Sequence, residues 1–228
     1  MFAVLKMKIR STLESRRDKG WHELNYWQGR QQAEGTLKNS HYLPLYTTMF
    51  QVDRSFYASR RVLDIGCGPR GSLEWATETA ERVGLDPLVE QYRTLGIARH
   101  AMTYVAAPAE HIPFGDGHFD IVTSLNSLDH VDDPKAAMVE IARVLKPGGS
   151  FLLEVEIGHD PTPMEPISFW FDILDDLASN FQVLDERRYE MPADGSHLVH
   201  DAWLCGGSFD MSQARHAGVL VAHLERRP

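Results

Sequence analysis

From residue 61 onward, short apolar runs alternate with amphipathic segments along the chain. The apolar runs predict five β-strands, at 61–66, 82–86, 102–106, 119–125 and 149–156. The amphipathic segments between them predict helices at 71–81, 87–98 and 134–145. Because alternating strands and helices form right-handed crossovers, this pattern predicts a parallel sheet with helices on both faces.

The predicted helix at 134–145 has the clearest ends. Asp133 suits the N-cap, and Pro134 suits the first helical position. The apolar residues of this segment recur at helical spacing and predict one buried face: Ala137, Met138, Ile141 and Leu145. Pro147-Gly148-Gly149 then ends the helix and turns the chain into the next strand.

Beyond residue 157 the pattern becomes less regular. A proline-rich stretch predicts a stiff loop, and a helix is expected to follow at about 166–179. Two further strands are expected near 181–190 and at 218–224. A long irregular connection at 191–216 is expected to join them. The fold class expected is therefore α/β, a Rossmann-like and mostly parallel sheet of seven strands.

The segment before the first strand has a different amino-acid composition. Residues 21–57 are rich in aromatic side chains and poor in β-branched ones, which favours two or three helices. We therefore expect a helical cover at 1–57 and a Rossmann-like core at 58–228, within one structural domain overall.

The composition is that of an ordinary soluble protein, because 43% of the residues are hydrophobic and 24% are charged. The formal net charge of −9 argues against a protein whose main task is to bind nucleic-acid backbones. The cysteines, Cys67 and Cys205, lack metal-type spacing. The first residues carry too short an apolar run for a signal peptide, and no run approaches a membrane span. We expect a cytoplasmic protein with no nucleic-acid or membrane partner.

A glycine-rich turn follows the first strand and carries the chemistry. Asp64 closes the strand, and Gly66 and Gly68 let a ligand approach the backbone with no Cβ in the way. Asp86 ends the second strand, where an acid accepts hydrogen bonds from ribose hydroxyls. These features predict an adenosine-containing cofactor.

The spacing of Gly66, Gly68 and Gly71 also matches the G-x-G-x-x-G fingerprint of NAD-binding proteins. Asp64 argues against that alternative, because a carboxylate facing the ligand attracts an ammonium group and repels a pyrophosphate. In addition, some sixty residues of helical character precede the turn, whereas dinucleotide fingerprints usually open a domain.

Five motifs occur in a fixed order along the chain: VLDIGCG at 62–68, GLDP at 84–87, AEHIPFGDGHFDIV at 109–122, NSLDHV at 126–131 and RVLKPGG at 143–149. On these residues the chain resembles the class I S-adenosylmethionine-dependent methyltransferases, close to the small-molecule group. The likeness covers roughly residues 60–155. It departs from the family pattern at Arg70, where a glycine is usual, and at Pro108, where an acid is common.

The resemblance implies a role for each motif residue. Gly66, Cys67 and Gly68 are expected to cradle the methionine and ribose of S-adenosylmethionine, and Asp64 to support its amino end. The remaining expected cofactor contacts are Asp86 with the ribose, Pro87, Ala109 and Glu110 with the adenine, and Asn126 with the methionine.

His130 is the expected general base, because its segment follows the fourth strand and an imidazole titrates near neutral pH. Asp129 is expected to face solvent, with orientation of His130 as the alternative. The residues expected to contact the acceptor are His41, Tyr42, Tyr46, His159 and Glu165.

No metal ligand is assigned from the sequence. A site built from His159, Asp160 and Glu165 is set aside, because the spacing matches no standard pattern. A group at 197–201 that contains His197, His200 and Asp201 is interpreted as a solvated strand or hairpin.

The function predicted is methyl transfer from S-adenosylmethionine to an oxygen or nitrogen atom of a small molecule by in-line displacement. One alternative is an RNA or protein methyltransferase, for which the basic stretch 6–19 is the only hint. Another is a non-catalytic S-adenosylmethionine-binding module, and a third is an NAD-linked oxidoreductase.

Overall fold

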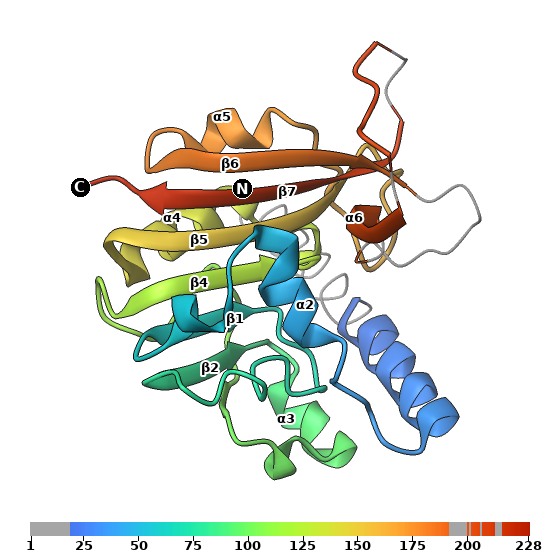
Figure 1. The fold of residues 1–228 in the computed structure, drawn as a ribbon. Helices are drawn as coiled ribbons and strands as arrows, with labels where there is room; N and C mark the ends of the chain where they lie inside the picture. Colours follow the sequence, from blue (N-terminus) through green and yellow to red (C-terminus); the bar gives the residue numbers. More distant parts are fainter. Residues whose placement is uncertain (1–18, 192–199, 201, 206, 213–215) are drawn as a thin grey trace, which may run out of the picture.

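The structure is a computed structural model that describes residues 19–191, 200, 202–205, 207–212 and 216–228 (Figure 1). Its centre is one seven-stranded sheet with the strand order β3-β2-β1-β4-β5-β7-β6. The strands are β1 (Arg61–Ile65), β2 (Glu81–Leu85), β3 (Thr103–Val105), β4 (Phe119–Leu125), β5 (Leu145–Ile157), β6 (Phe181–Glu190) and β7 (Gly218–Arg226). β7 runs antiparallel to both of its neighbours, β5 and β6, whereas the other adjacent strands pair in parallel. The predicted Rossmann-like sheet is confirmed.

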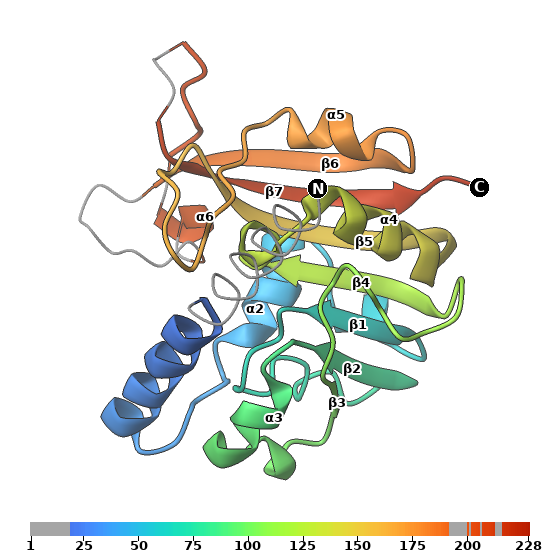
Figure 2. The same ribbon diagram turned by 180° about the vertical axis from the view of Figure 1, so that it is seen from behind.

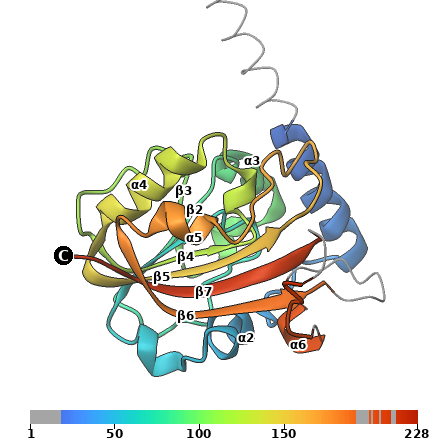
Figure 3. The ribbon, with the colours of Figure 1, turned by 90° about the horizontal axis from the view of Figure 1, so that it is seen from above.

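The central strands are buried on both faces, which explains their continuous apolar runs. In β1, Val62 and Leu63 point to opposite faces, and neither is exposed. The helix α2 (Tyr42–Tyr46) packs on one face together with the short 3₁₀ segments at Thr48–Phe50 and Arg54–Tyr57. Figures 2 and 3 show α4 (Pro134–Val144) and α5 (Ile173–Leu177) on the other face. The sheet therefore has helical layers on both sides.

The helix predicted at 134–145 is confirmed as α4. Asp133 caps it, because its Oδ1 accepts a hydrogen bond from the backbone N–H of Ala136 at 3.1 Å. The next strand begins earlier than predicted, because Leu145 already pairs with Phe119 of β4. Pro147 and the two glycines lie inside the residue range of β5, before its main pairing with β4 and β7.

The prediction of a helix at 71–81 is wrong. Residues 68–78 consist mostly of turns, and Gly71 among them has a φ of +77°, which departs from helical geometry. Tertiary contacts replace the helical hydrogen bonds: the Ser72 hydroxyl donates to Asp64, and the Trp75 ring packs 4.9 Å from the Tyr57 ring. The turn therefore leads into no helix N-terminus that would face a ligand.

Two other helices are shorter than predicted. The segment 87–98 contains α3 (Val89–Tyr92) and two 3₁₀ turns, Arg93–Leu95 and Ile97–Arg99, because Gly96 at φ +92° separates them. The helix expected at 166–179 is reduced to α5, since Phe169 instead forms a bridge with Ile157 at the end of β5. A short helix, α6 (Ala202–Cys205), lies within the connection at 191–216.

A helix at residues 19–34 lies across the carboxyl ends of the strands (Figure 1). Two hydrogen bonds fix its ends: Lys19 Nζ donates to the carbonyl of His130 at 2.6 Å, and Gln31 Nε2 donates to the carbonyl of Leu95 at 3.1 Å. In the described part of the chain, every helix is too short or too polar to cross a bilayer.

Candidate functional site

A cavity of about 960 Å³ lies between the N-terminal helix and the carboxyl ends of the central strands. It is lined by every residue predicted for cofactor binding and by the predicted base: Asp64, Gly66, Cys67, Gly68, Asp86, Pro87, Ala109, Glu110, Asn126 and His130. Of the residues predicted to contact the acceptor, His41, Tyr42, Tyr46 and Glu165 line the cavity as well. His159 does not line it. The roles of these residues stay predictions.

The glycine-rich turn has room for no larger residues. Gly66 adopts φ +66°, and a Cβ there would lie 2.3 Å from the Cβ of Ser127. Gly68 adopts φ +55°, and the Trp27 ring of the N-terminal helix would lie 3.1 Å from its Cβ. Cys67 packs against Gly84 of β2 in the same way, so its small side chain serves packing. Burial raises the pKa of the Cys67 thiol, which disfavours a nucleophilic thiolate.

Asp64 is buried at the end of β1 and is held by hydroxyl groups. It accepts hydrogen bonds from Tyr46 Oη at 2.9 Å, from Thr123 Oγ1 at 2.6 Å and from Ser72 Oγ. Burial raises the pKa of the Asp64 carboxyl to about 6, although these hydrogen bonds favour the carboxylate. Tyr46, predicted to contact the acceptor, is therefore a partner of Asp64 at the cavity wall.

Asp86 joins the glycine-rich turn to the loop after β2. Its Oδ2 accepts a hydrogen bond from the N–H of Gly68 at 3.2 Å, and its Oδ1 accepts one from the N–H of Leu88 at 2.8 Å. Burial raises the pKa of Asp86 to about 7. The carboxylate thus lies where the first and second strands end, as expected for a ribose contact.

Asn126 has the geometry of a ligand contact. It adopts φ +47°, and its backbone N–H donates to the carbonyl of Glu154 at 2.9 Å. Its Oδ1 is buried and accepts no hydrogen bond from any residue that the structure describes. An unpaired acceptor at a cavity wall fits an ammonium or hydroxyl donor of a bound molecule. Together with Asp86 and the glycine turn, it fits an amino-acid nucleoside such as S-adenosylmethionine.

Glu110 has a structural role at the cavity edge. Its Oε1 accepts hydrogen bonds from the N–H groups of Asp132 and Asp133, at 2.7 and 3.0 Å. These contacts fix the segment that carries His130 next to the start of α4. Ala109 and Pro87 line the cavity with Glu110, where the resemblance implies the adenine.

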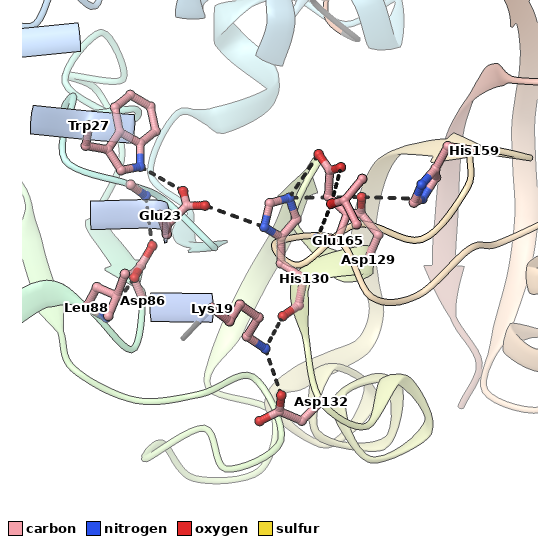
Figure 4. Close-up of polar contacts among 12 residues, drawn as sticks. Lys19, Glu23, Trp27, Asp86, Leu88, Asp129, His130, Asp132, His159 and Glu165 are labelled. Atoms are coloured by element: carbon pink, nitrogen blue, oxygen red, sulfur yellow. Dashed lines mark hydrogen bonds and ion pairs between the residues drawn. The ribbon is translucent and has the colours of Figure 1, made fainter. Parts of the chain in front are cut away.

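The surroundings of His130 differ from those expected. Asp129 is fully buried, so the expectation that it faces solvent is wrong. His130 Nδ1 lies 3.7 Å from Glu23 Oε2, and its Nε2 lies 4.0 Å from Asp129 Oδ2 and 3.9 Å from Glu165 Oε1 (Figure 4). None of these distances is a hydrogen bond.

A third histidine in the cavity, besides His41 and His130, was not predicted to be functional. His200 lines the cavity, and its Nδ1 lies 2.6 Å from Oε2 of Glu154, which is fully buried in β5. The interpretation of His200 as part of a solvated strand is therefore wrong, while His197 and Asp201 lie outside the described residues. The signal available in the sequence was Glu154 itself, an acid in the middle of a buried apolar strand.

Arg70, where the family usually has glycine, is almost fully buried and also lines the cavity. Its guanidinium donates to Glu34 on the N-terminal helix and to the carbonyl of Lys38 at 2.8 Å. It lies 5.3 Å from the ring centroid of Trp27. The departure from the family pattern thus supplies contacts to the helix that covers the cavity.

Comparison with known proteins finds methyltransferase relatives of the central part of the chain. Residues 63–153 match the family model described as a methyltransferase domain. A ubiquinone/menaquinone biosynthesis C-methyltransferase from Psychromonas ingrahamii is 44% identical over 81 residues, which cover 35% of this chain and 30% of that protein. A malonyl-[acyl-carrier protein] O-methyltransferase from Pseudescherichia vulneris is 37% identical over 94 residues, which cover 39% of this chain and 36% of that protein. The chain thus spans less than half the length of either relative.

The solved structure of N-methyltransferase NodS from Bradyrhizobium japonicum, in complex with S-adenosyl-L-homocysteine, has the same fold. The TM-score is 0.58 at 14% identity, and the match covers 83% of this chain and 89% of that one. S-adenosylmethionine is the cofactor of the matched family. The matched segment, the sheet order and the five ordered motifs are thus similar to those of the class I S-adenosylmethionine-dependent methyltransferases.

Proposed function

We propose that the chain transfers a methyl group from S-adenosylmethionine to an oxygen or nitrogen atom of a small molecule. One arrangement carries the proposal: a single cavity is lined both by the groups that fit the cofactor and by a histidine paired with a buried carboxylate. The names of the relatives support methyl transfer, and the malonyl-[acyl-carrier protein] O-methyltransferase supports an oxygen acceptor, whereas the relative of quinone biosynthesis is a C-methyltransferase.

S-adenosylmethionine supplies a methyl group on a positively charged sulfur. The lone pair of the acceptor forms the new bond to the methyl carbon while the carbon–sulfur bond breaks and its electron pair stays on sulfur. The protein then has two tasks, to align the acceptor with the methyl group and to receive the proton of an O–H or N–H acceptor.

His200 fits the proton-accepting role better than His130, the residue predicted from the sequence. Its Nδ1–H donates to Glu154 Oε2 at 2.6 Å, and a buried carboxylate in this position orients the ring and stabilises the imidazolium that forms. The carboxylates around His130 lie at 3.7–4.0 Å and orient its ring less firmly. We therefore assign the proton transfer to His200.

The cavity favours a small acceptor over a macromolecule. The N-terminal helix covers the cavity and contributes Glu23, Tyr26 and Trp27 to its wall, so an acceptor must fit beneath the helix. Tyr26, Trp203 and Leu204 give this wall an apolar and aromatic part. The formal net charge of −9 disfavours RNA as the acceptor. An acceptor with a ring or an apolar portion suits these surroundings.

The test begins with the cofactor. S-adenosylhomocysteine and S-adenosylmethionine should raise the melting temperature, whereas NAD should not, because only a ligand of the folded state stabilises it. Release of S-adenosylhomocysteine is then measured with panels of phenols, carboxylates and amines. Stabilisation by NAD alone would overturn the proposal. Binding of S-adenosylmethionine without transfer to any panel would favour a non-catalytic binding module.

A further inference from the structure

Four polar side chains from two loops meet beside the cavity (Figure 4). Asp129 and His130 follow β4, whereas His159 and Glu165 belong to the loop after β5. Asp129 Oδ2 lies 4.0 Å from Nε2 of His130 and 4.0 Å from Nε2 of His159. Glu165 Oε1 lies 3.9 Å from Nε2 of His130. The loops thus bring together residues that lie about 30–36 positions apart in the sequence.

The facing atoms are buried and lack hydrogen-bond partners. Within the part of the chain that the structure describes, both carboxylate oxygens of Asp129 and the Nε2 atoms of His130 and His159 are without one. Asp129 itself is fully buried. Leaving a buried carboxylate unpaired is costly, so the arrangement calls for a positive charge among these atoms.

The spacing suits an ion better than direct contacts. One ligand atom each from Asp129, His130 and Glu165 lies within 4.8 Å of the other two. The contacts of 3.9–4.0 Å are too long for hydrogen bonds. Atoms that each lie about 2.0–2.2 Å from one ion are separated by at most about 4.4 Å, so a small inward movement completes the site.

The neighbouring contacts orient the ligand atoms. Thr162 Oγ1 donates to Glu165 Oε2 at 3.0 Å, which leaves Oε1 directed at His130. His159 Nδ1 lies 3.0 Å from the carbonyl of Asp160 and donates to it, so its Nε2 faces Asp129 as an acceptor. Outer contacts of this kind fix ligands in metal sites.

We propose that Asp129, His130 and Glu165 bind one divalent transition-metal ion, while His159 faces the Asp129 carboxylate from outside this set. An imidazole among carboxylates favours Zn²⁺ or Mn²⁺ over Mg²⁺ and Ca²⁺, which prefer oxygen ligands alone. The combination differs from the set considered in the sequence, because Asp160 contributes only its carbonyl to His159.

The position of the ion beside the cavity suggests that it takes part in the reaction, an inference that rests on the proposed function. His130 and Glu165 line the cavity, so the open coordination positions face the space for the acceptor. An acceptor hydroxyl bound to the ion loses its proton more readily, and a neighbouring oxygen of the same molecule could occupy a second position. The site therefore points to acceptors that carry two adjacent oxygen atoms, and His200 remains available as the base.

The test is a calorimetric titration of untagged, chelator-treated protein with ZnCl₂, MnCl₂ and MgCl₂. We expect one equivalent of Zn²⁺ or Mn²⁺ to bind more tightly than Mg²⁺. Glu165→Gln and Asp129→Asn should each weaken Zn²⁺ binding at least ~10-fold, since loss of outer contacts alone typically costs 10–100-fold. Thr162→Val tests such an outer contact and should weaken binding within that range.

Matched controls come from the same loop and from the surface. Asp160→Asn keeps the carbonyl that His159 uses, and His111→Ala removes an exposed histidine, so both should bind Zn²⁺ like the unchanged protein. Glu165 lies in a partly exposed loop, so its variant keeps the test valid if Asp129→Asn does not fold.

Absence of saturable Zn²⁺ and Mn²⁺ binding, or equal affinity in Asp129→Asn and Glu165→Gln, would overturn the metal site. S-adenosylhomocysteine binding is measured on the same preparation. Cofactor binding without metal binding removes only the metal site, whereas metal binding without cofactor binding removes only the proposed function.

Discussion

Arg70 donates two hydrogen bonds of 2.7 Å to the two carboxylate oxygens of Glu34, one from each terminal nitrogen. The pair joins the glycine-rich turn to the N-terminal helix, and both side chains are largely shielded from solvent. Bidentate geometry makes such a contact stronger than an exposed ion pair. The pKa of Glu34 is lowered to about 2, chiefly by its hydrogen bonds to Arg70.

Replacing Arg70 with alanine should therefore lower the free energy of unfolding by about 1.5–3 kcal/mol, the range for hydrogen bonds to charged groups. Urea denaturation followed by circular dichroism measures the change. Arg93→Ala is the matched control, because its pair with Glu90 is well exposed and should contribute less than about 1 kcal/mol. Equal losses in the two variants would contradict a special role for Arg70.

Cofactor affinity should depend on pH through Asp86. Burial, together with the nearby Glu23, raises its pKa to about 7, although the hydrogen bond from the Leu88 N–H and the nearby His130 act to lower it. Only the carboxylate form accepts hydrogen bonds from both ribose hydroxyls, so the affinity for S-adenosylhomocysteine should fall as pH drops below about 7.

Titration calorimetry at several pH values between about 6 and 8 checks this dependence around the pKa of Asp86. Asp86→Asn should bind S-adenosylhomocysteine weakly at every pH, with the slope in this range lost. A variant that retains the full slope would show that another group controls it.

Gly66→Ala should abolish cofactor binding or folding. The added Cβ would lie 2.3 Å from Ser127 Cβ, and φ +66° costs a non-glycine residue about 1–2 kcal/mol before the clash is counted. Gly115→Ala is the control, because a Cβ there meets nothing within 4 Å. Thermal melting and S-adenosylhomocysteine binding report both effects, and an unaffected Gly66→Ala protein would refute the packing of the turn.

His200→Ala should reduce turnover ~100-fold or more, in the range of general-base contributions, with cofactor affinity unchanged. Glu154→Gln keeps the shape but removes the charge that orients His200, and should reduce turnover less. His130→Ala is compared in the same assay. If it lowers turnover without lowering metal affinity while His200→Ala has no effect, the base is His130, as predicted from the sequence.

The sequence predicted the sheet, and the residues expected on the cofactor side line one cavity, because those signals are local. Asp64, Gly66 and Asp86 each lie at the end of an apolar run, and parallel strands bring such ends to one edge. The prediction of a helix at 71–81 failed because the amphipathic pattern resembles that of a helix, whereas successive turns bury Leu73 and partly bury Trp75. The spacing of apolar residues alone does not distinguish a helix from a series of turns that buries the same side chains.

The acceptor side was less predictable because it depends on contacts between distant residues. His200 meets Glu154 across 46 positions, and Glu165 meets His130 only because its loop folds back over the end of β4. Neither spacing follows a known motif. Asp129 gave no sign of burial, since it lies in a polar segment between Ser127 and Asp133.

The N-terminal helix has one more consequence, for the order of events in a catalytic cycle. Trp27 rests on Gly68, and Lys19 bonds to the carbonyl of His130, so this helix touches both the turn beneath the cofactor and the loop beneath the acceptor. Spent cofactor must leave past it before fresh cofactor enters. Under the proposed function, cofactor exchange past this helix would set an upper limit on turnover wherever it is slower than methyl transfer.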